Sequence, residues 1–112
     1  MAIKLFPVAE KFNEKEPYSE VILETPEFAV FHVYVKKGQK VELHESNAYM
    51  IITVVQGKGK FFVGSYDNVE HLSEDETIVY EKHELHGYEA EEDMIVQTVA
   101  VPNPLLHQFD EE

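Results

Sequence analysis

The sequence predicts a single all-β domain, built as an antiparallel sandwich or barrel. Its 112 residues fit one domain and leave no room for a second. Short runs rich in Val, Ile, Phe and Tyr recur at regular intervals and are punctuated by Gly, which is typical of antiparallel β proteins. No segment keeps a helical period. Hydrophobic residues make up 44% of the chain, enough to build a core.

The first expected element is an N-terminal arm over residues 1–17, which has a short strand candidate at 3–6 and is otherwise polar. This arm is either a flexible tail or a segment that pairs with a partner subunit. The barrel is expected over residues 18–104. A C-terminal tail, residues 105–112, follows two prolines, and we expect it to fray.

Eight strands are expected in the barrel region, and their boundaries follow the β-branched and aromatic runs. They are residues 21–23, 28–35, 41–44, 49–56, 61–64, 69–72, 77–80 and 94–101. The run over 49–56 is continuously apolar or β-branched, so we expect it to be buried on both faces. Residues 36–39 predict a turn, and Gly57 and Gly59 predict a hairpin turn with positive φ.

The charge of the chain limits its partners. The net charge is −13, and all nine basic residues are lysines. Such a surface repels phosphate backbones and anionic lipids, so we expect no nucleic acid and no membrane partner. The absence of Arg argues against an anionic substrate, because such a substrate is usually held by a guanidinium.

Several kinds of site are excluded by composition. The chain has no Cys, which excludes disulfides, thiol nucleophiles and thiolate metal sites. It contains no nucleophile-elbow, P-loop or dinucleotide motif. Seven of the first 20 residues are charged, which excludes the apolar stretch of a signal peptide, and no run is long enough to span a bilayer. We therefore expect a cytoplasmic location.

The strongest local signal is a turn glycine, Gly38, followed by a short strand that ends at His44 and, further on, by Gly57. With these spacings the sequence resembles the cupin family, whose first motif is G-x5-H-x-H-x3,4-E-x6-G. Ser46 stands where the motif has its second His, and Met50 stands where it has Glu. The first motif is thus half retained.

The second cupin motif, G-x5-P-x-G-x2-H-x3-N, is matched only at His86. Asp75, Glu81, His83 and Ala90 replace the Gly, Pro, Gly and Asn. The surrounding pattern still fits, with an acidic turn, a β-branched strand and a loop before His86. The resemblance covers roughly residues 25–102 and implies a jelly-roll barrel, or double-stranded β-helix.

The resemblance also implies a metal centre, in which imidazoles and one carboxylate point into the barrel. His44 and His86 are therefore candidate ligands of a divalent transition metal ion (Fe, Mn, Ni, Cu or Zn). Two protein ligands bind a metal poorly, so others would have to contribute. The alternative is a pair of cavity histidines bonded to each other, to water or to a small ligand.

His32 and Glu42 are the candidate third ligands. His32 is a polar residue inside a strand of Val, Phe and Tyr, which requires a reason; the alternative is a core histidine satisfied by a neighbour. Side chains alternate along a strand, so we expect Glu42, His44 and Ser46 to share one face. His83 and His71 are further histidines near these strands, and we expect both of them, and His107, at the surface.

The cavity expected from the resemblance has an apolar wall, because Met50 and Ile52 share a strand face. Ser46, Met50, Ile52 and Tyr88 are the residues we expect to contact a bound small molecule. Tyr88 has the strand parity of His86 and is expected near the cavity mouth.

Three functions remain open from the sequence. The first is a metal-dependent cupin of the oxygenase or isomerase type that acts on a small molecule. The second is a metal-free cupin that binds or senses a small apolar ligand. The third is a non-catalytic interaction module; small cupins often pair through sheets and arms, so we expect a homodimer.

Overall fold

The computed structural model of the protein describes residues 2–7 and 11–107, and its regular secondary structure consists almost entirely of strands. The elements are β1 Tyr18–Glu24, β2 Ala29–Val35, β3 Lys40–His44, β4 Tyr49–Gln56, β5 Lys58–Val63, β6 Val69–Ser73, β7 Thr77–Tyr80, β8 His86–Ala90, β9 Met94–Val101 and the single helical turn α1 Pro104–His107. Within these described ranges, no helix is long and apolar enough to cross a membrane.

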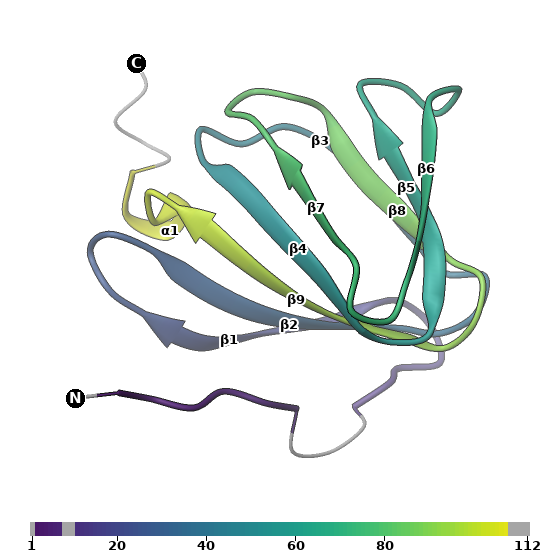
Figure 1. Cartoon of the computed structure of the whole chain (residues 1–112), viewed down its shortest axis with the longest axis horizontal. Coiled ribbons are helices and arrows are strands. Elements are labelled where there is room, and N and C mark those ends of the chain that lie inside the picture. The colour runs from purple at the N-terminus through teal and green to yellow at the C-terminus, as the bar shows by residue number, and fades with distance from the viewer. Residues whose placement is uncertain (1, 8–10, 108–112) are drawn as a thin grey trace.

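The strands form two antiparallel sheets that face each other (Figure 1). One sheet has five strands in the order β1-β2-β9-β4-β7, and the other has four in the order β3-β8-β5-β6. The chain moves from one sheet to the other after β2, β3, β4, β6, β7 and β8, which is the double-wound path of a jelly roll. The predicted all-β barrel is confirmed.

Most expected strands are found, and three of them have the expected bounds: β4, β7 and β9. Two expectations about strands are wrong. Residues 3–6 form no strand, and β8 was not expected as a strand because its sequence, His-Gly-Tyr-Glu-Ala, has few β-branched residues. It is held in place by pairing on both sides, with β3 and β5.

The turn at Gly57 also differs from the expectation. Gly57 has the expected positive φ of 84°, but β4 and β5 belong to different sheets, so the turn is a corner and not a hairpin. A Cβ at this position would lie 2.3 Å from the carbonyl O of Asp93, so only glycine fits there. Gly59 lies inside β5 and has no positive φ.

The core lies between the two sheets and is formed by their inward-facing side chains. The most deeply buried of these residues are Val35 and Val54 on the five-stranded sheet, Phe61 on the four-stranded sheet, and Met94 and Val96 on β9. Burying one such side chain stabilises the fold by about 1.5–3 kcal/mol. β4 is buried on its inner face only, because Tyr49 and Val55 are exposed on the outer face; the expectation of burial on both faces is wrong.

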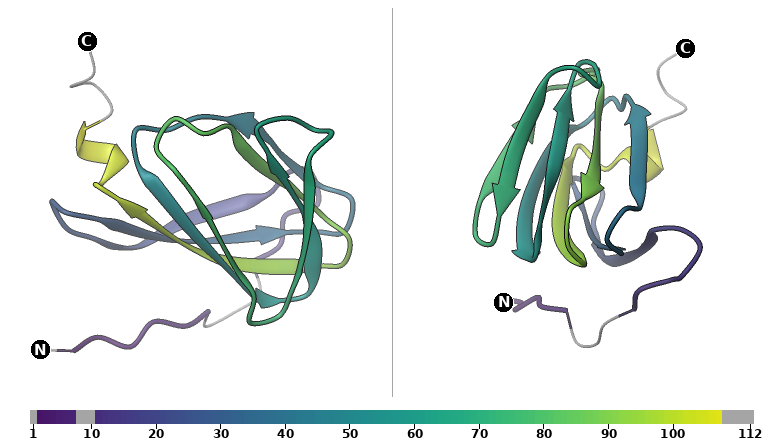
Figure 2. Two further views of the ribbon diagram at one scale, coloured as in Figure 1. Left: turned by 45° about the horizontal axis from the view of Figure 1, so that its top comes forward. Right: turned by 90° about the vertical axis from the view of Figure 1, so that its right-hand side faces the viewer.

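The outer face of β2 is covered, which explains why that strand is almost completely buried. Part of the N-terminal arm lies against it: the ring of Phe12 contacts the ring of Tyr34 edge-on at 5.8 Å, and the Gln39 side chain donates to the Asn13 carbonyl. Figures 1 and 2 show the N-terminal segment running outside the barrel beside β1 and β2. Residues 11–17 of the arm therefore pack on their own barrel.

Candidate functional site

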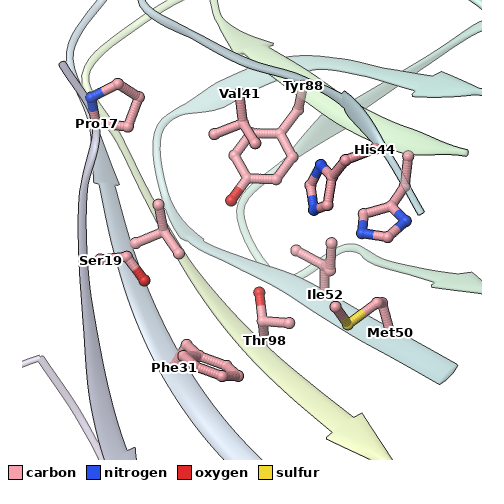
Figure 3. Close-up of a pocket in the computed structure, with 11 residues that line it drawn as sticks. Pro17, Ser19, Phe31, Val41, His44, Met50, Ile52, Tyr88 and Thr98 are labelled. Atoms are coloured by element: carbon pink, nitrogen blue, oxygen red, sulfur yellow. The ribbon is translucent and has the colours of Figure 1, made fainter. Parts of the chain in front are cut away.

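A cavity of about 340 Å³ lies between the two sheets, where their strands diverge (Figure 3). Its walls are mostly apolar, and both sheets and the end of the arm contribute to them. It is lined by Pro17, Ser19, Phe31, Val33, Val41, His44, Met50, Ile52, His86, Tyr88 and Thr98.

The two histidines come from neighbouring strands of the four-stranded sheet, and a β-bulge aligns them. Val41 pairs with Tyr88 and His44 pairs with His86, so three steps along β3 match two along β8. This extra residue shifts the alternation of β3, so that Val41 and His44 both face the cavity. The bulge lies against Gly87, where a Cβ would be 2.6 Å from the carbonyl O of Val41. The close contact of β3 with β8 therefore requires glycine at position 87.

The imidazole rings of His44 and His86 lie with their centroids 4.2 Å apart. Nδ1 of His44 donates to the carbonyl O of Glu42 at 2.9 Å, and Nδ1 of His86 donates to the carbonyl O of Glu84 at 3.0 Å. A carbonyl can only accept, so each neutral ring carries its proton on Nδ1 and a lone pair on Nε2. Both rings are thus held in the tautomer that binds a metal ion or a hydrogen-bond donor through Nε2.

His86 is buried at the base of this pair, whereas His44 is exposed on its rim. Burial lowers the pKa of His86, and the nearby His44 lowers it further, while the bond to the Glu84 carbonyl opposes them. The ring is therefore neutral at pH 7. Its Nε2 is buried and has no hydrogen-bond partner within residues 2–7 and 11–107.

Tyrosines surround His86 but leave its Nε2 without a partner. The ring of Tyr80 lies 5.2 Å from that of His86, but its hydroxyl donates to the Phe62 carbonyl at 2.9 Å. Burial raises the pKa of both Tyr80 and Tyr88, so both hydroxyls stay protonated. Tyr88 faces the cavity (Figure 3).

Solved structures of other proteins share this architecture closely. An RmlC-like cupin from Desulfovibrio desulfuricans superposes with a TM-score of 0.83 at 27% identity, over 92% of this chain and 98% of that one. The chain is a member of the cupin superfamily. A conserved protein with a double-stranded β-helix domain from Klebsiella pneumoniae gives a TM-score of 0.80 at 24% identity, over 90% of this chain and 91% of that one.

A more distant cupin superfamily protein from Desulfitobacterium hafniense still gives a TM-score of 0.73 at 11% identity, over 81% of this chain and 82% of that one. No protein-family model and no curated protein sequence matches the chain. The kinship of this cupin is therefore visible mainly in its fold.

Of the residues predicted for the site, the structure brings His44, His86, Met50, Ile52 and Tyr88 to one cavity. Ser46, which stands at a ligand position of the cupin motif, is not among the residues lining it. Its hydroxyl accepts from the Ala48 amide at 3.1 Å, and its carbonyl accepts from the His83 amide at 2.8 Å. Ser46 shapes the loop after β3 instead.

His32 and Glu42, the candidate third ligands, do not reach the cavity. Phe31 and Val33 line it, so the intervening His32 points to the opposite face of β2, where it is fully buried and its Nε2 donates to Gln97 Oε1 at 2.8 Å. The bulge in β3 separates Glu42 from the face of His44, and its carboxylate accepts from the Tyr66 hydroxyl at 2.5 Å. The expectation that Glu42, His44 and Ser46 share a face is wrong.

The remaining histidines of interest lie at the surface. The His83 side chain is about half exposed beside the Glu45 carboxylate at 3.4 Å, and that of His71 is mostly exposed beside Glu91 at 3.6 Å. The prediction for His107 falls on a side chain outside the described residues.

Six further lining residues were missed: Pro17, Ser19, Phe31, Val33, Val41 and Thr98. The signal for Phe31 and Val33 was their alternation with His32, which puts them on one face. Thr98 is the polar residue on the inner face of β9, between Val96 and Ala100. Pro17 and Ser19 carried no sequence signal for a site.

The complete four-ligand set of the cupin motif does not fit this chain. Within residues 2–7 and 11–107, no three side chains of His, Cys, Asp or Glu are grouped so that they could hold a metal ion. What fits a metal is the pair of imidazoles, because both Nδ1 atoms are tethered to carbonyls and the buried Nε2 of His86 lacks a partner.

Proposed function

We propose that this cupin binds a metal ion through Nε2 of His44 and His86, and that a small, mostly apolar molecule binds beside it in the cavity. The observation that carries the proposal is the buried Nε2 of His86, which has no hydrogen-bond partner among the residues that the structure describes. Leaving a buried polar atom unpaired costs about 1–3 kcal/mol. A ligand that accepts the lone pair would remove this penalty.

The tethers of both rings support a metal ion as that ligand. Metal-binding histidines commonly donate their other ring N–H to a carbonyl or carboxylate, which fixes the ring and raises its basicity. His44 and His86 both do this with backbone carbonyls. The lowered pKa of His86 keeps the ring unprotonated at neutral pH, as metal binding requires.

The cavity supports a small molecule as the second ligand. Two imidazoles leave coordination positions free, and an ion held by them would offer these positions, as a Lewis acid, to an oxygen or nitrogen of the bound molecule. The volume of about 340 Å³ suits a compact molecule. Phe31, Val33 and Ile52 would contact its apolar part and exclude water.

The charge of the protein supports binding of a cation. The net charge of −13 concentrates cations near the surface, and the exposed rim position of His44 gives access to the pair. Among the described residues that line the cavity there is no Lys, so the apolar molecule would be held without an ion pair.

A second candidate function is metal-free binding of a small apolar molecule with one hydroxyl. It is favoured by the loss of two of the four motif ligands, now Ser46 and Met50. In this case the ligand hydroxyl would donate to Nε2 of His86, and the apolar wall would hold the rest of the molecule.

Equilibrium dialysis of the full chain, stripped of metal, tests the first function. The ions tested are Cu⁺, Cu²⁺, Ni²⁺, Zn²⁺ and Mn²⁺, and we expect the chain to bind one equivalent of at least one of them. The variants His44→Ala and His86→Ala should weaken this binding at least tenfold, whereas the surface control His71→Ala should not change it. If no ion binds, or if the cavity variants bind as well as the control, the proposal is wrong.

Phenol, an apolar ring with one hydroxyl, is the probe for the second function. In metal-free protein, phenol that shifts the His86 ring resonances in NMR, with loss of binding in His86→Ala, would support metal-free recognition. Phenol that leaves these resonances unchanged would contradict it.

A further inference from the structure

Met50 occupies the place in this cavity where the cupin motif has its carboxylate. It lies on β4, on the sheet opposite the two histidines, and lines the same cavity. On the adjacent strand β7 it pairs with Tyr80, whose ring centroid lies 5.2 Å from that of His86. Figure 3 shows Met50 and His44 at the same end of the pocket. The thioether is thus the donor that faces the histidine pair from the other wall.

The donor set of this end of the cavity is neutral, and it includes one soft donor, the thioether. Two imidazole nitrogens and one thioether sulfur carry no charge, and within the described ranges no Asp, Glu or third His joins them. Thioether and imidazole ligands suit Cu(I), whereas carboxylates suit Mn and Fe. The remaining polar groups in the lining are the hydroxyls of Ser19, Tyr88 and Thr98, which are poor ligands for a soft ion.

Charge and coordination number favour the same ion. The penalty for burying an ion rises with the square of its charge, and no carboxylate is present here to offset it. A monovalent ion therefore costs far less to bury beside His86 than a divalent one. Structural zinc sites use four protein ligands, and magnesium or manganese sites use oxygen ligands, whereas the three donors available here are neutral, two imidazoles and one soft thioether.

We propose that His44 Nε2, His86 Nε2 and Met50 Sδ form a three-coordinate site for Cu(I). This inference rests on the proposed function, because it uses the same histidine pair, and it narrows the metal to a soft monovalent ion. The three rotatable bonds of Met50 let its sulfur adjust to an ion held by the fixed imidazoles. The apolar wall around Met50, including Ile52, shields the site from water.

Anaerobic competition with bicinchoninate tests the site with Cu(I) alone. The full chain should take Cu(I) from its coloured complex in a 1:1 ratio. Met50→Leu keeps a similar volume but removes the sulfur, and it should weaken Cu(I) binding at least tenfold while Zn²⁺ binding changes less than twofold. Met50→Glu restores the motif carboxylate, and it should weaken Cu(I) binding and strengthen Zn²⁺ and Mn²⁺ binding at least tenfold.

X-ray absorption of the Cu(I)-loaded protein gives a readout that does not depend on affinity. We expect two nitrogen neighbours and one sulfur neighbour of copper in the native chain, and no sulfur neighbour in Met50→Leu. Circular dichroism and thermal melting show whether each variant is folded.

The possible results separate the two proposals. Binding that needs His86 but shows no sulfur neighbour and no effect of Met50→Leu would overturn the Cu(I) site and leave the histidine-bound metal standing. Failure of every metal ion to bind in a His86-dependent manner would overturn both. A sulfur neighbour that disappears in Met50→Leu would support both.

Discussion

His44 and His86 make the same hydrogen bond: each donates its Nδ1–H to the carbonyl of the residue two positions earlier, Glu42 or Glu84. The rings are inclined at 60° with their centroids 4.2 Å apart. The neighbouring strands β3 and β8 thus hold the two imidazoles in the same tautomer, with the lone pair of each Nε2 available.

Gly87 should set the spacing of the pair. A Cβ at position 87 would lie 2.6 Å from the Val41 carbonyl O, which is a backbone atom that cannot move independently of its strand. We expect Gly87→Ala to push β3 away from β8, to lower the free energy of unfolding by about 1–3 kcal/mol, and to weaken metal binding. Urea denaturation and equilibrium dialysis measure these effects.

A core substitution away from the site is the control for Gly87. Leu72→Ala on β6 should destabilise the fold by about 2–5 kcal/mol but leave metal affinity within twofold. Equal losses of affinity in both variants would show that general destabilisation, and not the strand spacing, is responsible.

His86 should make the metal-free protein less stable in acid. Its pKa is lowered in the folded state, so between that value and the ordinary value of 6.5 the unfolded chain binds more protons than the folded one. Stability is therefore unaffected by this group above about pH 7 and falls as the pH drops through 6.5. Urea denaturation should show that the free energy of unfolding decreases less from pH 7.5 to pH 5 in His86→Gln than in the native chain. In His71→Gln this free energy should decrease as much as in the native chain. The same decrease in all three proteins would refute the prediction.

Tyr80→Phe should affect stability but not binding. The Tyr80 hydroxyl donates to the Phe62 carbonyl at 2.9 Å in the core, and losing a hydrogen bond of this kind costs about 1 kcal/mol. The ring beside His86 is retained in Phe, so metal affinity should stay within twofold. A tenfold loss of affinity would mean that the hydroxyl takes part in the site.

His32→Ala tests whether His32, a candidate third metal ligand from the sequence, has a structural role instead. His32 is fully buried, away from the cavity, and donates to Gln97 at 2.8 Å. We expect the free energy of unfolding to fall by about 2 kcal/mol or more, because the substitution leaves a cavity and an unpaired Gln97 amide, and we expect metal affinity to stay unchanged. Thermal melting and dialysis measure the two effects, and loss of metal binding in a folded variant would assign His32 to the site.

The fold could be predicted from the sequence because the β-branched runs are clear and glycines mark the corners. The bounds of β4, β7 and β9 follow directly from these runs. β8 was missed because its formation depends on partners on both sides and not on its own residues. The sequence also could not show that Gly57 joins strands of two different sheets, since a turn residue does not reveal whether the strands it joins share a sheet.

The site was predictable only in part, for reasons of strand geometry. His44, His86 and Met50 stand at motif positions, and the structure brings them to one cavity. Strict alternation, however, gave Glu42 the wrong face, because the bulge in β3 arises where that strand meets Gly87. His32 was a candidate because it is polar, but its neighbours Phe31 and Val33 already defined the inner face.

Nε2 of both His44 and His86 should hold a metal ion, and anomalous diffraction shows this directly in crystals grown with each ion of the dialysis series, Cu⁺ being handled anaerobically. We expect a strong anomalous peak within bonding distance of both Nε2 atoms for at least one ion, and no such peak in crystals of His86→Ala. A cavity without anomalous density for any of these ions, with metal bound only at surface groups such as His71 or His83, would contradict the proposal.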